Sequence, residues 1–438
     1  MASLLQRIGN RDLLHRGAQA MVLKVLSSLC LLGFNLLVVH HYEPTLAGEF
    51  FLCITLVLVA SQFIRFGMDN VLVKQVSVLR SSNDQQRLAT LCSSALLITL
   101  IAGIALASLM YAAADWLAAA LFSKPSMAPM LRLMALATPF YGVCLLLSYI
   151  NQGLSRIGLH IASLNLGQVT LASLLLAGGV HLAGLPAGIE LLAGSYVAGC
   201  ALMMLYMLAC TARQVQLGAA NVRVDRVLPL VRESFPLFIV ALTQLVMVWS
   251  SQLFLGAWAS ASDVAIYTIA QRVAMVTSFV LMAVNSVVAP RFAVHYHNGE
   301  MRQLEQLSRL SLRVMLLMAT PLLVAMLLFP QPILSLFGSG YASAAPVLII
   351  LALGQFVNVV TGPVGYLLQM SGHYRQVRNN TALAALTAVG LNVMLTPQYG
   401  ILGAAVAAAV ALSVVNLLGL WQVRRLLGFR LAGAMRTA

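Results

Sequence analysis

Charged residues are scarce in this chain of 438 residues: they make up 9% of it, whereas hydrophobic residues make up 61%. Soluble domains carry about 25% charged residues, so this inventory excludes a water-exposed globular protein and predicts an integral membrane protein. The net charge of +14 does not indicate nucleic-acid binding, because the basic residues lie in short gaps between apolar runs, where membrane topology explains them.

Patterns that hold metals or disulfides are also missing. The six cysteines lie inside apolar runs without a CxxC spacing, so they are interpreted as small buried apolar residues. The eight histidines form no metal pair at helical spacing. We therefore predict no metal, no cofactor and no catalytic residue, and leave proton or sodium coupling open. The first apolar run exceeds the h-region of a cleavable signal, which predicts an uncleaved first span.

What the chain does contain is a series of long apolar runs. A transmembrane helix needs about 20 mainly apolar residues, and these runs are much longer than barrel strands and lack a two-residue alternation. The runs lie at roughly 17–40, 46–68, 88–113, 130–152, 159–182, 187–211, 234–258, 263–290, 308–331, 344–370, 376–396 and 399–422. We predict an all-α polytopic membrane protein with about 12 transmembrane helices.

The second half of the chain repeats features of the first. Ala128-Pro129 and Gln152 recur as Ala345-Pro346 and Gln369, about half the chain length later. Self-similarity at half-length indicates a duplicated architecture, here two six-helix lobes of the same orientation with the substrate path between them. The longest polar gap follows the sixth run, which predicts a lobe at 1–215, a cytoplasmic linker at 216–232 and a lobe with a cytoplasmic tail at 233–438.

The gaps between runs alternate in charge. With the N-terminus inside, the inner segments hold eighteen basic residues, and the outer gaps hold only Lys124. Positive charge is retained on the cytoplasmic side of membrane proteins. We therefore predict that both termini are cytoplasmic.

Four ionisable residues stand out within predicted spans or at their ends: Lys24, Arg65, Asp69 and Arg272. Each costs about 2.5–3.5 kcal/mol at mid-helix on insertion scales and is a functional hypothesis by default. Three of the four are basic, and fixed cations in a wet cavity would stabilise an anionic substrate. A structural interpretation stands beside this one, because Lys24 can extend to the inner headgroups, and Arg65 and Asp69, four residues apart, can pair with each other.

Neutral polar residues form a second set of candidates. Asn35 shares a helical face with Lys24, and Gln355 and Asn358 share a face of the tenth run. Such groups hydrogen-bond sugars or hold helices together. We therefore predict a substrate cavity containing Lys24, Arg65, Asp69, Arg272, Asn35, Gln355 and Asn358.

Three short sequences carry a family resemblance: 332–338 (PILSLFG), the Ala47-Gly48-Glu49-Phe50 opening of the second run, and the Gln369-Met370-Ser371-Gly372 ending of the tenth. With the six-plus-six pattern, they resemble the polysaccharide transporter family of the multidrug/oligosaccharidyl-lipid/polysaccharide exporter superfamily. The resemblance implies a flippase in the bacterial cytoplasmic (inner) membrane. It would translocate undecaprenyl-pyrophosphate-linked oligosaccharide to the outer leaflet by alternating access, for surface polysaccharide such as O-antigen or exopolysaccharide.

The implied partners are the lipid-linked oligosaccharide, membrane lipid, and polymerase and chain-length proteins of the same pathway, with no nucleic acid. In this interpretation Asp69 is the candidate for ion coupling, although an ion pair with Arg65 would hold its carboxylate ionised. Three alternatives stay open. A drug or cation antiporter of the same fold would place carboxylates in its cavity. A membrane glycosyltransferase, ligase or polymerase would need acid or base residues and a sizeable outer loop, and a scaffold would need no intramembrane charge.

Overall fold

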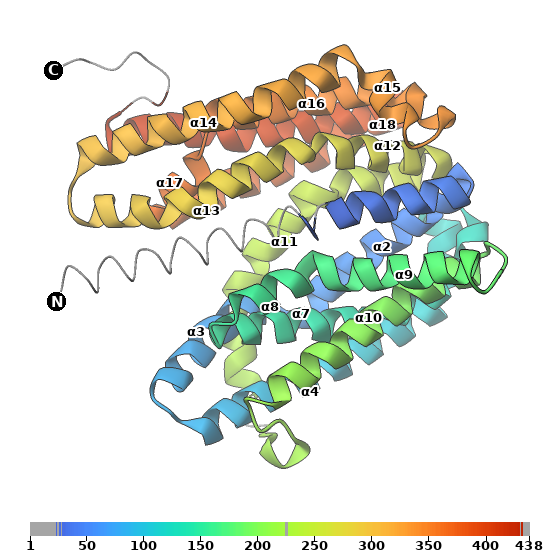
Figure 1. Cartoon of the computed structure of the whole chain (residues 1–438), viewed down its shortest axis with the longest axis horizontal. Helices are drawn as coiled ribbons and strands as arrows, with labels where there is room; N and C mark the ends of the chain where they lie inside the picture. Colours follow the sequence, from blue (N-terminus) through green and yellow to red (C-terminus); the bar gives the residue numbers. More distant parts are fainter. Residues whose placement is uncertain (1–22, 24–25, 28, 224–226, 430, 432–438) are drawn as a thin grey trace. The chain divides into compact units, whose positions relative to one another are not determined.

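The computed structural model describes residues 23, 26–27, 29–223, 227–429 and 431, and every regular element among them is a helix (Figure 1). Eight helices in this part of the chain are long and apolar enough to cross a membrane, or ten if each of two bent pairs forms one span. The all-α polytopic membrane fold predicted from the sequence is thus confirmed.

The helices coincide with the predicted runs. Leu29–His41 is the described part of the first run. Tyr374–Leu427 (α18) covers the last two runs, because two helices join at Gly400, whose φ of 54° is not helical.

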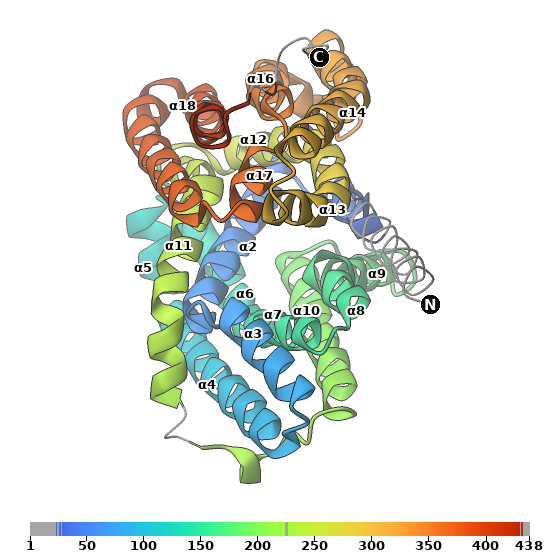
Figure 2. The same ribbon diagram turned by 90° about the vertical axis from the view of Figure 1, so that its left-hand side faces the viewer.

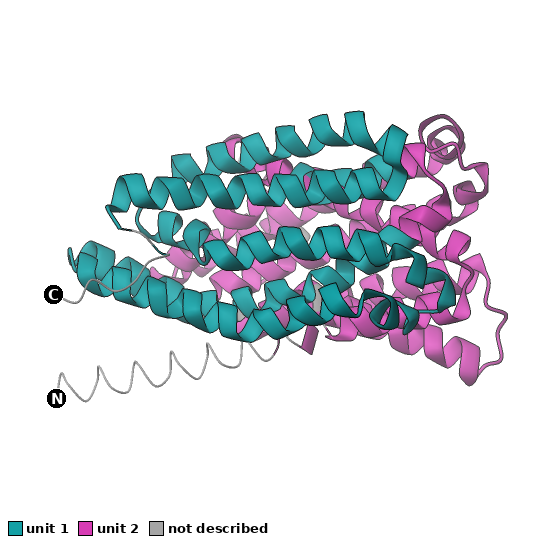
Figure 3. Cartoon of the chain, turned by 90° about the horizontal axis from the view of Figure 1, so that it is seen from above, with its two compact units in different colours: residues 1–22, 246–255, 266–438 teal, residues 23–245, 256–265 magenta. Residues whose placement is uncertain are grey.

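The chain forms two compact units, coloured separately in Figure 3. Unit 2 contains Leu23–Leu245 and Gly256–Ala265, and unit 1 contains Val246–Leu255 and the chain from Ile266 onward. Two helices contribute to both units: α11 (Val227–Trp258) and α12 (Ala261–Ala274). The lobe boundaries drawn from the sequence repeat remain a prediction.

Unit 2 is a bundle of packed helices. Helix α9 lies beside α10, and α7 packs on α3, α4 and α10 (Figure 2). The helices that precede α11 in this unit are α2 (Pro44–Arg65), α3 (Met68–Ser81), α4 (Gln85–Ala112), α5 (Ala114–Trp116), α6 (Ala128–Ala135), α7 (Ala137–Gly153), α8 (Ile157–Ile161), α9 (Gly167–His181) and α10 (Ile189–Ala212).

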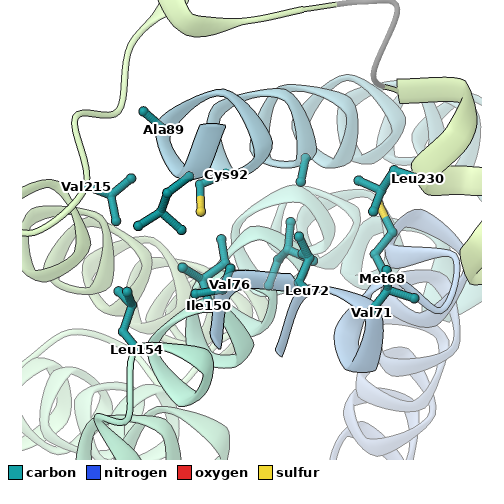
Figure 4. Close-up of a cluster of buried hydrophobic side chains, with 13 residues drawn as sticks. Met68, Val71, Leu72, Val76, Ala89, Cys92, Ile150, Leu154, Val215 and Leu230 are labelled. Atoms are coloured by element: carbon teal, nitrogen blue, oxygen red, sulfur yellow. The ribbon is translucent and has the colours of Figure 1, made fainter. Parts of the chain in front are cut away.

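A core cluster of unit 2 shows how these helices meet (Figure 4). Met68, Leu72 and Val76 follow one another at four-residue spacing on α3, which places them on one helical face. They pack with Cys92 of α4 and Ile150 of α7. The Cys92 thiol is free and fully buried, as expected for a cysteine that serves as a small apolar residue.

Unit 1 is also a bundle of packed helices. Helix α16 packs on α14 and α18, and α13 packs on α14. Besides α18, the helices that lie wholly in this unit are α13 (Val276–His297), α14 (Met301–Leu328), α15 (Pro330–Ser335), α16 (Ala345–Thr361) and α17 (Val364–Met370). Helix α16 ends where Gly362 takes a φ of 72° and Pro363 follows, because proline cannot donate the next helical hydrogen bond.

Candidate functional site: a buried ion pair and a polar pocket

A break after α2 sets up the charged site of unit 2. Phe66 and Gly67 both adopt left-handed backbone conformations, with φ of 46° and 73°, so α2 ends at Arg65 and α3 begins at Met68. The Phe66 ring stacks on Phe238 of α11, with centroids 4.6 Å apart. A Cβ on Gly67 would collide with the Phe238 backbone, so no larger residue fits here.

This break corrects one detail of the sequence analysis. Asp69 was predicted to lie with Arg65 at the end of the second span, but it lies on the next helix, α3. The predicted pairing itself is confirmed, because Arg65 Nη1 donates to Asp69 Oδ2. The run of apolar residues continues through the break, so hydrophobicity alone does not reveal it.

Each of the three guanidinium nitrogens of Arg65 donates a hydrogen bond. Its Nε donates to the carbonyl oxygen of Ser61 at 3.0 Å, and its Nη2 donates to Gln62 Oε1 at 2.8 Å. Arg65 is 5% exposed and Asp69 is 8% exposed. The two opposite charges balance each other, which is the arrangement that makes buried charge tolerable.

Only one of the two Asp69 carboxylate oxygens has a bonding partner among the described residues. Its Oδ2 binds Arg65, whereas its Oδ1 is buried and has no hydrogen-bond partner within the described part of the chain. Tyr149 of α7 is the neighbouring polar group, close enough to interact with Arg65. The arrangement therefore leaves one acceptor oxygen beside a neutralised cation.

Asn35 lies in unit 2 on the helix Leu29–His41 and is 2% exposed. Its Nδ2 donates to the carbonyl oxygen of Leu31 at 2.6 Å. This bond within one helix satisfies part of the buried amide without a substrate. Lys24, which was predicted to share its face, lies outside the described residues.

The Lys124 ammonium binds three backbone carbonyl oxygens. Its Nζ donates to the carbonyl oxygens of Phe122 at 3.0 Å, Gly256 at 2.5 Å and Ala259 at 2.7 Å. The last two lie at the C-terminal end of α11, where unpaired carbonyls favour a cation. Partial burial lowers the pKa of the Lys124 ammonium, and the nearby carboxylates of Glu49 and Asp263 oppose this shift.

Gly48, from the second short sequence of the family resemblance, permits a close helix approach. A Cβ at this position would overlap the carbonyl oxygen of Ala261 at the start of α12. Small residues at such crossings let membrane helices pack backbone against backbone. The motif thus has a packing role in unit 2.

The second site is a pocket of about 190 Å³ that lies wholly within unit 1. We call it the unit 1 pocket. Its residues come from α11, α12, α13, α16, α18 and the α12–α13 junction, and none of these described residues carries a charge. They are Met247, Val248, Gln271, Ala274, Met275, Ser278, Leu351, Gln355, Asn358, Ala408, Ala409 and Leu412.

Three of the polar side chains in this pocket form one connected group. Ser278 Oγ donates to Gln355 Oε1 at 2.9 Å, and Asn358 Nδ2 donates to the same oxygen at 3.2 Å. The structure thus brings together the predicted Gln355 and Asn358. Sequence reasoning missed Gln271 and Ser278, whose only available signal was a polar residue inside an apolar run.

Arg272 lies next to Gln271 on α12 and is half-buried. Its guanidinium carbon is 5.5 Å from the ring centroid of Trp249 on α11. This distance is within the range of a cation–π interaction. Trp249 in turn follows Val248, a pocket residue, so Arg272 is connected to the pocket wall through both helices.

One protein-family model matches most of the chain. The model of the polysaccharide biosynthesis protein family matches residues 19–295, well over half of the chain. The chain belongs to this family. A second model, MatE, matches residues 236–397 of the polysaccharide biosynthesis protein.

Relatives of this polysaccharide biosynthesis protein are transporters. A probable low-salt glycan biosynthesis flippase, Agl15 of Haloferax volcanii, is 30% identical over 171 residues, which cover 39% of this chain and only 36% of the length of that relative. The lipid II flippase MurJ in an inward closed conformation has a similar fold, with a TM-score of 0.75 at 13% identity over 92% of this chain and 87% of MurJ.

A multidrug resistance MATE family transporter of the MOP superfamily, in an inward-facing conformation, gives a TM-score of 0.71 at 14% identity, over 94% of this chain and 98% of that one. At these identities the two structural similarities establish the fold, which is that of the multidrug/oligosaccharidyl-lipid/polysaccharide exporter superfamily.

Proposed function

We propose that this polysaccharide biosynthesis protein is a flippase that translocates a lipid-linked oligosaccharide across a membrane. The observation that carries the proposal is the uncharged unit 1 pocket in a member of this family. Gln355 lies ten residues into α16, and at 1.5 Å per residue this corresponds to about 15 Å, half the thickness of a bilayer core. Transporters of this kind bind substrate near the midplane.

The pocket favours a sugar over a cationic drug. Sugars present hydroxyl groups that both donate and accept, and the amides of Gln355 and Asn358 do the same. A pocket for a cation would gain from a carboxylate, and the described residues that line this one include none. The drug or cation antiporter remains the second candidate, because the MatE model also matches the second half of the chain.

The finer features of the proposal follow from the sequence analysis. The cargo would be linked to undecaprenyl pyrophosphate and would move from the cytoplasmic to the outer leaflet of a bacterial inner membrane, with both termini cytoplasmic. Alternating access through a cationic central cavity belongs to the same proposal. The charge balance at Arg65 and Asp69 moves the role of pyrophosphate contact to Arg272, with Lys24 as a second cation.

The proposal assigns Asp69 no part in ion coupling while Arg65 stays paired with it. The Asp69 carboxylate is already engaged as the counter-charge of Arg65. The Arg65–Asp69 pair would instead fix the junction of α2 and α3.

The test is translocation of a fluorescent lipid-linked oligosaccharide by the purified protein in proteoliposomes, read as the fraction that an externally added quencher or glycosidase can reach. Arg272→Ala should reduce the initial rate at least about tenfold, and Arg272→Lys should retain part of it, because the lysine keeps the charge but loses the planar stacking on Trp249. Unchanged rates in both variants at equal protein levels would contradict the role of Arg272.

A further inference from the structure

The hydrogen bonds of the unit 1 pocket leave a specific set of groups unused. Gln355 Oε1 already accepts from Ser278 and from Asn358. Among the described residues no group bonds to Nε2 of Gln355 or to Oδ1 of Asn358. The pocket therefore presents an N–H donor and a carbonyl acceptor on successive turns of α16, since residues three apart lie on the same helical face.

An amide is the chemical complement of this pair. A secondary amide offers one carbonyl acceptor and one N–H donor, which match the Gln355 N–H and the Asn358 oxygen respectively. A single hydroxyl can satisfy both groups only by bridging them. An amide thus forms one hydrogen bond with each of the two groups.

Apart from Gln271, the rest of the pocket is apolar. Met275, Leu351 and Leu412 line it together with alanines and with Met247. Flexible methionine side chains adapt to small apolar groups. A methyl group attached to the amide carbonyl would pack on this wall, so the pocket as a whole matches an acetamido group rather than a bare hydroxyl.

The size of the pocket agrees with a single substituted sugar. At about 190 Å³ it is smaller than the roughly 300–1,000 Å³ of sites that enclose a drug-sized ligand. It can take one sugar residue of a longer glycan, or part of one, and leaves the remainder outside.

From the unused hydrogen-bonding groups, the apolar wall and the size of the pocket, we propose that the unit 1 pocket is a subsite for an N-acetylated sugar of the transported glycan, with the acetamido group held by Gln355 and Asn358. This proposal rests on the flippase function and specifies its substrate class. Ser278 acts as a positioning residue, because its hydroxyl fixes the Gln355 amide so that Nε2 remains available.

Binding of free sugars to the purified full-length protein tests the subsite directly. We would record saturation-transfer NMR with N-acetylglucosamine and with glucose. The acetamido methyl should receive the strongest saturation, and N-acetylglucosamine should bind at least about tenfold more tightly, a difference of about 1.4 kcal/mol. Equal affinities for the two sugars, or a methyl signal no stronger than the ring signals, would overturn the proposal.

Single-residue variants test whether the sugar binds at Gln355 and Asn358. Gln355→Glu keeps the size of the side chain but removes its N–H donor, and Asn358→Leu removes the acceptor, so each should abolish most of the preference. Thr361→Val is the matched control, because Thr361 lies on the same helix, bonds to the backbone carbonyl oxygens of Val357 and Asn358 rather than to a pocket side chain, and does not line the pocket. An unchanged preference in folded Gln355→Glu and Asn358→Leu would refute the assignment.

Translocation assays separate this proposal from the function on which it rests. Two lipid-linked oligosaccharides that differ only by an acetamido or a hydroxyl substituent would be compared in proteoliposomes. Faster translocation of the acetamido form supports both proposals, and equal translocation refutes the subsite while the flippase function stands. Absence of any translocation, with the sugar preference intact, refutes the flippase function alone.

Discussion

The buried Arg65–Asp69 pair provides the sharpest prediction about stability. Asp69→Asn keeps the shape of the side chain but leaves the Arg65 guanidinium without its counter-charge at 5% exposure. Removing one partner of a buried pair costs about 3–5 kcal/mol. Arg65 keeps its hydrogen bonds to Ser61 and Gln62, so we expect a loss near 3 kcal/mol.

Reversible unfolding of the purified protein in mixed micelles would measure this loss. The double variant Arg65→Met/Asp69→Leu should recover most of it, because an apolar replacement removes both desolvation costs together. Asp115→Asn is the control, since its pair with Arg132 is exposed and exposed pairs contribute about 0–1 kcal/mol. An Asp69→Asn variant as stable as the Asp115→Asn variant would refute the buried-pair interpretation.

Three further predictions concern packing and charge. Gly48→Leu should lower the unfolding free energy by at least about 1–3 kcal/mol, the usual range for overpacking, because a Cβ there overlaps Ala261; a thermal shift within error of wild type would contradict this. Lys124→Met should lower it by about 1.5–3 kcal/mol, the range for bonds from charged groups, and Lys124→Arg should restore part of it, measured in the same assay. Trp249→Leu should weaken translocation less than Arg272→Ala, because it removes only the stacking contact; equal rates for the two variants would argue that Trp249 does more than support Arg272.

Much of the fold could be predicted from the sequence, because long apolar stretches have few alternatives in a bilayer. The breaks within these stretches were harder. The left-handed backbone at Phe66 has no signal in its residue type, and only Gly67 hinted at the end of α2. The kink at Gly400 separates two runs that hydropathy had already divided.

The candidate site was predictable only where its residues are close in sequence. The four-residue spacing of Arg65 and Asp69 gave their pairing, and the three-residue spacing of Gln355 and Asn358 gave their shared face. The contribution of Ser278 depends on how α13 packs on α16, a tertiary contact that spacing along the chain does not contain.

The central claim is that the chain flips a lipid-linked oligosaccharide, and the most direct test is a comparison of two cargoes in one preparation. Proteoliposomes with the purified protein would receive a fluorescent lipid-linked N-acetylated oligosaccharide or a radiolabelled cationic drug. The proposed function predicts protein-dependent translocation of the oligosaccharide and drug fluxes equal to those of empty liposomes. Drug exchange without oligosaccharide translocation would contradict it.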